Sequence, residues 1–305
     1  MDETRPRRAL AWLAFALLAA VYYGNFYVYD SIGPVADLLQ QQRGFSDTQI
    51  GVLNAIDSLP NVVLILIGGM LVDRYGAGRV LLWSTAVCLS GAVLTAFGPD
   101  FTTMAAGRLF FGIGAETQNI AMTVAIIDWF AGGRIAFAMG LSLAIGRSGS
   151  FSADMSPAWF AGAYAGGWQP PLVIAAVIAA IGMVGAIAYR YLDARSRAVT
   201  GGAREPHPRL AARDLLTFGR AYWYLLVLCV LWYAVILAFR STFAIKYFQH
   251  AHGLDLATAG AMNSYVFLSA MFATPAFGWL CDRTGRYAPM LVLGALLLPL
   301  SLAIM

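Results

Sequence analysis

The chain has 305 residues, of which 60% are hydrophobic and 12% are charged, and its mean hydropathy is +0.68. Water cannot coat a surface of this composition, so a soluble globular protein is excluded and a bilayer protein is expected. The formal net charge of +4 does not call for a nucleic-acid partner, because the basic residues cluster between apolar segments.

Nine apolar windows are each long enough to cross a bilayer as a helix, which takes about 20 residues. They cover residues 9–29, 48–72, 79–97, 102–127, 134–160, 171–191, 218–244, 256–280 and 287–305. We therefore predict an all-α membrane protein of six plus three helices. We expect a six-helix bundle at 1–192, a cytoplasmic linker at 193–217 and a partial second bundle of three helices at 218–305.

Basic residues lie almost entirely in alternate connections between the predicted spans. Arg5, Arg7 and Arg8 precede the first span, and the polar segment between the sixth and seventh spans is rich in arginine. The positive-inside rule therefore places the N-terminus and this segment in the cytoplasm. Residues 1–25 have the basic start of a signal peptide, but their apolar stretch is too long and more spans follow, so we expect an uncleaved first helix.

A short acidic–basic hook follows the second predicted span and returns after the eighth. The first copy is GMLVDRYGAGR at 69–79, and the second is GWLCDRTGR at 278–286. Asp73 and Asp282 lie 209 residues apart, which is the period expected for a pseudosymmetric transporter that builds one gate in each half. Two matching halves need roughly 400 residues, so we expect this sequence to lack three helices.

Two charges inside predicted spans are candidates for a substrate site, because an ionisable group in hydrocarbon costs roughly 3 kcal/mol. Glu116 lies 15 residues before, and Arg147 lies 16 residues after, the loop centre near Ala131 that joins the fourth and fifth spans. Equal path lengths on antiparallel helices place both side chains near the bilayer midplane. Arginine binds a carboxylate and glutamate binds an ammonium, so the pair suits a zwitterion, with Asn119 as a neighbouring hydrogen-bonding group. The alternative is an ion pair formed between the two.

A second set of candidate substrate residues lies in the outer third of the predicted membrane. Tyr29 and Asp30 end the first span, and Asp57 lies at a similar height on the second. An interfacial aromatic belt is the alternative reading for the tyrosine. Arg240, deep in the seventh span, would add a positive charge from the second half.

The remaining polar residues suggest structural roles. Arg108 precedes the small residue Gly112, so we expect close helix packing there and a pairing of Arg108 with a neighbouring carboxylate. Lys246 is expected to be an interfacial anchor. His250 and His252 have no third ligand nearby in sequence and the three cysteines are isolated, so neither a metal site nor a cofactor is expected.

The repeated hook, the segment RLFFGIG at 108–114 and the Trp129-Phe130 dipeptide before Arg134 together resemble the major facilitator superfamily. That resemblance implies two six-helix bundles that rock around a central site, while hook residues hold helix ends together on the cytoplasmic side. The residues expected to act in gating are Asp73, Arg74, Arg108, Asp128, Arg134, Asp282, Arg283 and Arg286.

A closer resemblance is to the lysosomal dipeptide uniporter branch of that superfamily, which also has bacterial relatives. It rests on YD at 29–30, SLPNVVL at 58–64, GRLFFGIGAE at 107–116 and AIGRSGS at 144–150. The resemblance implies that Glu116 and Arg147 bind the backbone of a dipeptide. Asp57 and Leu59 depart from the pattern near Pro60, where an aromatic residue is expected, so the preferred side chain does not carry over. The Ala- and Arg-rich composition suits a bacterial inner membrane.

We therefore expect a secondary transporter of dipeptides or similar zwitterions that works by rocker-switch alternating access, as a uniporter or with protons as coupling ions. One alternative is an organic-anion or nitrate-type carrier, in which Arg108, Arg147 and Arg240 converge on a negative substrate. Another is a non-transporting membrane sensor or scaffold, although the repeated gate argues against it. No nucleophile–base pair points to an enzyme. Besides its solute the protein is expected to contact the bilayer, with no nucleic acid or obligate protein partner.

Overall fold

The computed structural model describes residues 4–130, 135–200, 219–284, 289 and 291–297, and every regular element in those ranges is helical. The first bundle comprises α1 (Thr4–Asp30), α2 (Ala36–Arg43), α3 (Asp47–Ala55), α4 (Asn61–Tyr75), α5 (Ala77–Phe97), α6 (Phe101–Phe130), α7 (Ile135–Trp159), α8 (Ala161–Ala165) and α9 (Gln169–Thr200). The second unit comprises α10 (Arg220–Ala238), α11 (Ala244–His252) and α12 (Leu256–Thr284).

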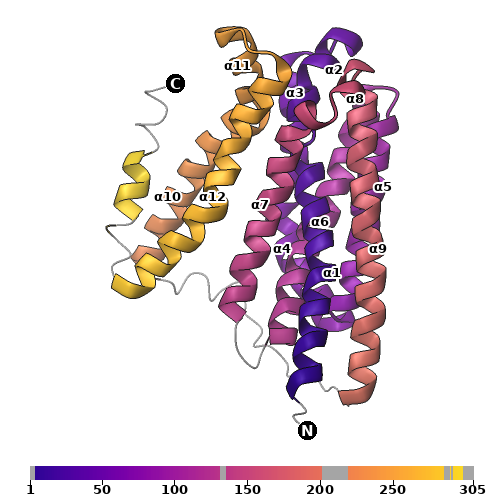
Figure 1. The fold of residues 1–305 in the computed structure, drawn as a ribbon, viewed down its shortest axis with the longest axis vertical. Coiled ribbons are helices and arrows are strands. Elements are labelled where there is room, and N and C mark those ends of the chain that lie inside the picture. The colour runs from indigo at the N-terminus through magenta and orange to yellow at the C-terminus, as the bar shows by residue number, and fades with distance from the viewer. Residues whose placement is uncertain (1–3, 131–134, 201–218, 285–288, 290, 298–305) are drawn as a thin grey trace.

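The long helices run side by side, and the short ones gather at the end of the molecule opposite the N-terminus (Figure 1). Within the described residues, five helical segments are long and apolar enough to cross a bilayer: Ala9–Arg43, Ala77–Phe97, Phe101–Phe130, Gln169–Ser196 and Leu256–Thr274. The predicted all-α membrane fold is confirmed. The predicted linker at 193–217 begins on the last turns of α9 and continues outside the described residues.

Two of the predicted spans are not continuous helices. The span expected at 48–72 is divided into α3 and α4 by a 3₁₀ turn at Ile56–Ser58, next to Pro60, which has no amide hydrogen with which to continue the helix ladder. The span expected at 218–244 is interrupted by a π-helical turn at Phe239–Phe243, after which α11 begins. Each interruption carries one buried charge, Asp57 in the first and Arg240 in the second.

Within the first bundle, α1 packs against α7 and α9, and α6 packs against α4 and α5. The predicted close packing at Gly112 is present, because a Cβ atom there would lie 2.0 Å from the main-chain oxygen of Asp57. Only glycine lets α6 touch this turn. The backbone of the interrupted helix is thereby held against the centre of the bundle.

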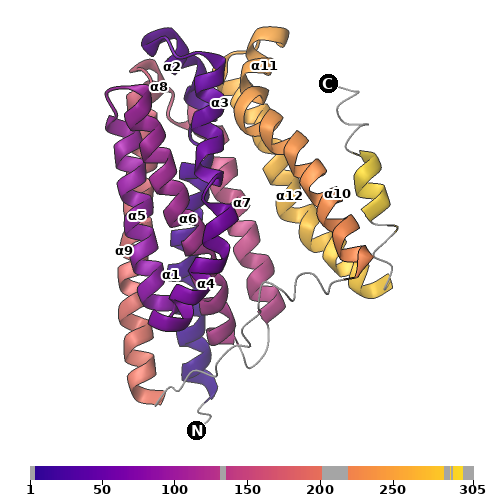
Figure 2. The ribbon, with the colours of Figure 1, turned by 180° about the vertical axis from the view of Figure 1, so that it is seen from behind.

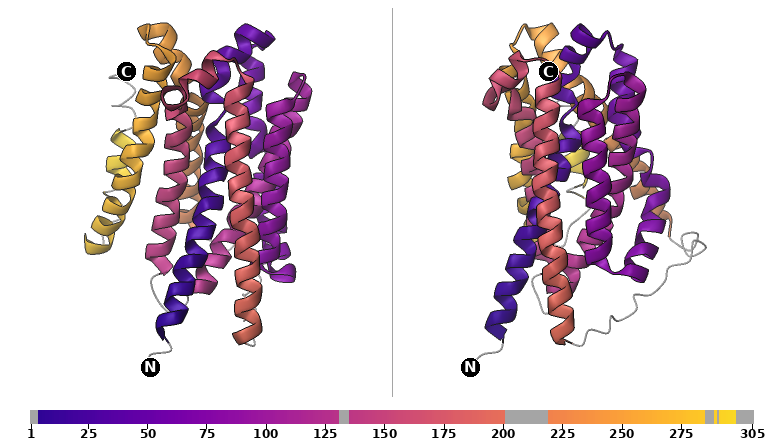
Figure 3. Two further views of the ribbon diagram at one scale, coloured as in Figure 1. Left: turned by 45° about the vertical axis from the view of Figure 1, so that its right-hand side comes forward. Right: turned by 90° about the vertical axis from the view of Figure 1, so that its right-hand side faces the viewer.

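The two parts of the chain meet at one end and diverge at the other. The second unit packs on the first bundle chiefly through α12 and α7. Figure 2 shows that α10 and α12 diverge from α7 towards the end that carries the N-terminus, and the left view of Figure 3 shows the same for α12. We call the opposite end, formed by α2, α3, α8 and α11, the distal end; the two parts are in contact there.

Candidate functional site

Glu116 of α6 and Arg147 of α7 are the two charges near the middle of their helices, and both side chains are half-buried. Neither forms an ion pair with the other or with any further residue in the part of the chain that the structure describes. Tyr22 of α1 lies within electrostatic reach of both. The guanidinium of Arg147 lies 5.8 Å from the ring centre of Phe267 of α12. The pair therefore belongs to one region, which the second unit also borders.

Asn119 adds a neutral polar group one turn along α6 from Glu116. Its side-chain oxygen is buried and has no hydrogen-bond partner, which is uncommon for a buried polar atom. Thr123 donates to the main-chain oxygen of Asn119 at 2.9 Å and so bonds to its own helix. The region thus offers a carboxylate, a guanidinium and an amide oxygen that the described residues leave available for a ligand.

Asp30 and Arg240, both expected near the substrate, lie together nearer the distal end in a buried network. Arg240 donates to the carboxylate of Asp30 and, at 3.3 Å, to that of Asp154 of α7. Asn263 of α12 donates to the same oxygen of Asp154 at 2.9 Å. We call Arg240, Asp30, Asp154 and Asn263 the distal network. It joins the two parts of the chain, since the carboxylates come from the first bundle and the donors from the second unit.

A second buried network holds the broken helix in place. Arg108 of α6 contacts the carboxylate of Asp57 at 2.5 Å and donates to the main-chain oxygens of Leu53, Val28 and Tyr29 at 2.9, 3.0 and 2.9 Å. The side chains of Arg108 and Asp57 are 1% and 0% exposed. We call this pair the pin. The expected pairing of Arg108 with a neighbouring carboxylate is present, and its partner is Asp57, which was also a candidate substrate residue.

Tyr29 also lies beside the pin. Its hydroxyl is 3.2 Å from that of Ser58, and its ring centre is 6.0 Å from the guanidinium of Arg108. These contacts tie the end of α1 to the 3₁₀ turn. They orient the ring within the first bundle.

The distal end carries a polar contact that the sequence analysis did not propose. Lys246 of α11 bonds to the side chains of Asp47 and Gln40, at 2.6 Å in each case, and His250 lies 2.8 Å from Asp37. We call these five residues the distal clasp. Hydrogen bonds from Lys246 and then from Gln40 lower the pKa of Asp47 below its ordinary value. The sequence did contain a signal for this contact. Asp37 and Asp47 lie in one predicted outer connection, and Lys246 and His250 lie in another.

Apart from Arg108, which belongs to the pin, the expected gating residues that the structure describes lie at the end of the molecule that carries the N-terminus. Asp73 and Arg74 are exposed on the last turn of α4, with the Arg74 guanidinium 5.3 Å from the ring centre of Tyr75. Asp128 is exposed near the end of α6, and Asp282 and Arg283 fall on the last turn of α12. Arg134 and Arg286 lie outside the described residues.

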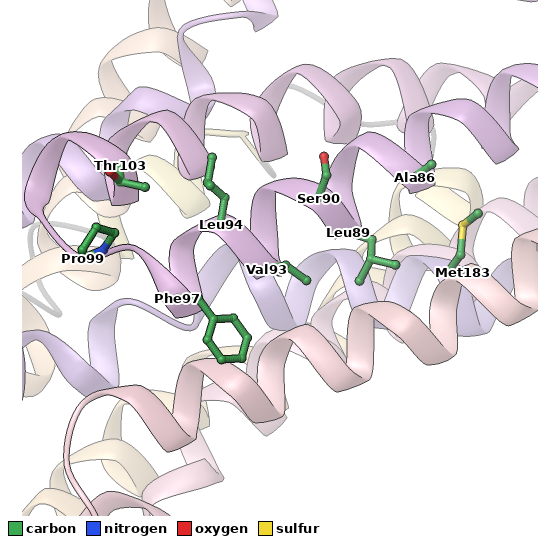
Figure 4. A pocket seen from close by; sticks show the side chains of 9 residues that line it. All are labelled: Ala86, Leu89, Ser90, Val93, Leu94, Phe97, Pro99, Thr103 and Met183. Atoms are coloured by element: carbon green, nitrogen blue, oxygen red, sulfur yellow. The ribbon is translucent and has the colours of Figure 1, made fainter.

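A groove of about 500 Å³ on the first bundle is apolar (Figure 4). It is lined by Ala86, Leu89, Ser90, Val93, Leu94, Phe97, Pro99, Thr103 and Met183. Val93, Leu94 and Phe97 are exposed on the outside of the bundle, and none of the lining residues is charged. The groove suits acyl chains better than a polar solute. No group of three or more potential metal ligands occurs among the described residues.

Comparisons with known proteins agree with this architecture. A sequence profile of the Major Facilitator Superfamily matches residues 14–305. The human lysosomal dipeptide transporter MFSD1 is 27% identical over 296 residues, which cover 92% of this chain and 63% of the relative. The probable sulfoacetate transporter SauU of Cupriavidus necator is 21% identical over 283 residues, with coverages of 89% and 65%. The chain thus spans less than two thirds of the length of either relative.

Among solved structures, the chain is similar to a bacterial homologue of the human lysosomal transporter Spinster, in an inward-facing and unoccupied conformation. The TM-score is 0.68 at 16% identity, and the match covers 91% of this chain and 64% of that one. The likeness supports the fold. Since the superfamily profile covers almost all of the sequence, this protein belongs to the Major Facilitator Superfamily.

Proposed function

We propose that this protein transports a small zwitterionic solute, most simply a dipeptide, by alternating access, with Glu116 and Arg147 as the charged substrate ligands. The observation that carries the proposal is that these two half-buried charges have no ion-pair partner in the described residues. The resemblance to MFSD1, whose name states dipeptide transport, agrees with this substrate class.

The energetics favour a ligand with both signs of charge. Each unpaired charge within the membrane span costs roughly 3 kcal/mol. A zwitterion would neutralise both at once, with its carboxylate on Arg147 and its ammonium on Glu116. Asn119, whose buried side-chain oxygen lacks a donor, is suited to the amide N–H that a dipeptide carries between its charged ends.

The contacts between the two parts fit a transporter closed at its distal end. The distal network and the distal clasp both join the first bundle to the second unit, while the helices diverge at the N-terminal end (Figures 1 and 2). With a cytoplasmic N-terminus, as the positive-inside rule predicts, this is an inward-facing arrangement in a bacterial inner membrane. Rocking of the two parts of the chain about the midplane site would bring the helix ends that carry Asp73 and Asp282 together and would open the distal end.

An organic-anion carrier is the second candidate, because Arg147 and Arg240 both approach the ring of Phe267, at 5.8 and 4.1 Å. The relative SauU, named as a probable sulfoacetate transporter, belongs to this class. Two carboxylates already contact Arg240, however, which leaves Arg147 as the cation available to an anion. A zwitterion therefore fits the local charges better.

Counterflow of radiolabelled dipeptides in liposomes that contain the purified full-length protein would test the proposal. Each charged contact is worth about 1.5–3 kcal/mol, so Glu116→Gln and Arg147→Ala should each reduce uptake at subsaturating dipeptide by about tenfold or more. Ser90→Ala, in the apolar groove, is the matched control and should transport normally. Dipeptide flux that survives both site substitutions would contradict the assignment. Uptake of sulfoacetate that is unaffected by Glu116→Gln, with no competition by dipeptides, would establish the anion carrier instead.

A further inference from the structure

The distal network contains one more acid than base. We propose that Asp30 and Asp154 hold one proton between them while the distal end is closed around Arg240, so that closing this end takes up a proton from the distal side.

The geometry couples this site to the contact between the two parts of the chain. Arg240 bridges both carboxylates, and the side chains of Arg240, Asp30 and Asp154 are only 8%, 3% and 3% exposed. A Cβ atom at Gly260 of α12 would lie 2.4 Å from the main-chain oxygen of Asp154, so the two helix backbones touch beside the network. Burial of the carboxylates therefore depends on contact with the second unit.

The charges around the network do not balance without a proton. Two carboxylates and one guanidinium leave one negative charge. Arg147 shares the ring of Phe267 with Arg240, and Glu116 lies in the same region as Arg147, so these two charges cancel. The pin contains one charge of each sign and cancels as well. The distal network, the pair Glu116 and Arg147, and the pin together therefore carry a net charge of minus one.

An uncompensated charge in a buried network is strongly unfavourable, whereas a neutral carboxylic acid is not. Asp154 is the better carrier of the proton, because its contact with Arg240 is the longer one and its other donor, Asn263, is neutral. A proton on Oδ1 of Asp154 leaves Oδ2 free to accept from both donors. When the two parts separate, Arg240 leaves with the second unit, water reaches both carboxylates and the proton dissociates.

The test measures the distal opening as a function of pH in the full-length protein without any substrate. Spin labels at the exposed residues Gln41 of α2 and Ala251 of α11 report the separation in lipid nanodiscs. The background carries His250→Gln, which removes the imidazole of the distal clasp. Between about pH 5.5 and about pH 8.5, the ratio of closed to open molecules should fall by up to about tenfold per pH unit.

Asp154→Asn should abolish this dependence and keep the distal end closed throughout, because Arg240 then faces a single carboxylate. Asp30→Asn should act in the same way and serves as the second variant if Asp154→Asn does not fold. An unchanged pH dependence in either folded variant, or a closed fraction that is independent of pH in the parent, would overturn the proposal. Because the measurement contains no dipeptide, it can contradict the proton proposal while the substrate assignment holds. Likewise, the transport assay can contradict the substrate assignment while the proton proposal holds.

Discussion

Gly260 of α12 lies directly against the main-chain oxygen of Asp154 in α7, at a point where a Cβ atom would approach that oxygen to 2.4 Å. The first bundle and the second unit therefore meet backbone to backbone beside the distal network. Gly260→Ala should force them apart there and shift the population towards a distally open state. The change is measurable as a longer distance between the labels at Gln41 and Ala251.

Gly140→Ala is the matched control for this substitution. Gly140 lies on α7, the helix that Gly260 of α12 contacts, and a Cβ atom there meets nothing within 4 Å. A distance distribution that is the same in both variants would show that the contact at Gly260 does not limit closure.

Removal of one partner from the pin should destabilise the protein more than removal of both. Arg108→Met leaves the carboxylate of Asp57, 0% exposed, without its cation, which costs about 3–5 kcal/mol. The double variant Arg108→Met with Asp57→Asn should recover part of that stability. The recovery is incomplete because the main-chain oxygens that accepted from Arg108 still lack a donor. Thermal unfolding in detergent measures both. Equal melting temperatures for the single and double variants would contradict a buried charge pair.

The distal clasp should weaken in acid. Hydrogen bonds from Lys246 lower the pKa of Asp47 when the distal end is closed. The contribution of the Asp47–Lys246 contact to closure is thus complete above the ordinary aspartate pKa of about 4. This contribution is lost as the pH falls through the lowered pKa of Asp47. The labels at Gln41 and Ala251 should therefore show more opening below about pH 4.

Two variants isolate this effect. Asp47→Asn should be insensitive to pH in that range. Asp100→Asn should behave as the parent does, because the carboxylate of Asp100 accepts from the Thr103 amide of its own bundle at 2.8 Å. The clasp and the distal network respond to acid in opposite directions and in different pH ranges, so one titration separates them.

Phe267 should influence substrate binding through Arg147. Its ring faces the guanidinium at 5.8 Å, and a cation–π contact of this kind contributes about 0.5–1 kcal/mol. Phe267→Leu keeps an apolar side chain but removes the aromatic face, so the KM for dipeptide should rise about two- to fivefold. Phe267→Tyr retains the face and should bind nearly normally. Equal effects of the two substitutions would point to packing alone.

The all-α membrane fold could be predicted from the sequence, because hydropathy is a local property, whereas the substrate role of Glu116 and Arg147 stays a prediction. The breaks at Ile56–Ser58 and Phe239–Phe243 were missed, since apolar composition continues through both. The partners of the buried charges were not predictable either. Arg240 contacts Asp30, 210 residues earlier in the chain, and only tertiary packing brings them together.

Lys246 illustrates the same limit. As a single basic residue after an apolar span, it fits an interfacial anchor, and nothing local distinguishes that role from a clasp. The structure shows the difference because α11 places Lys246 opposite Asp47 and Gln40 of the other part of the chain. A contact of this kind depends on how the two parts of the chain are arranged, which a local sequence pattern does not describe.

The π turn at Phe239–Phe243 places one additional residue in the helical path between α10 and α11. One residue corresponds to a rotation of about 100° around a helix axis. If this turn relaxed to regular α-helix, Arg240 would keep its place in the sequence but α11 would present a different face, so Lys246 and Arg240 could not both reach their partners. The turn therefore fixes the direction in which Lys246 points relative to Arg240. Insertion or deletion of a single residue after Arg240 in this turn would prevent the distal network and the distal clasp from forming together, although every charged side chain would still be present.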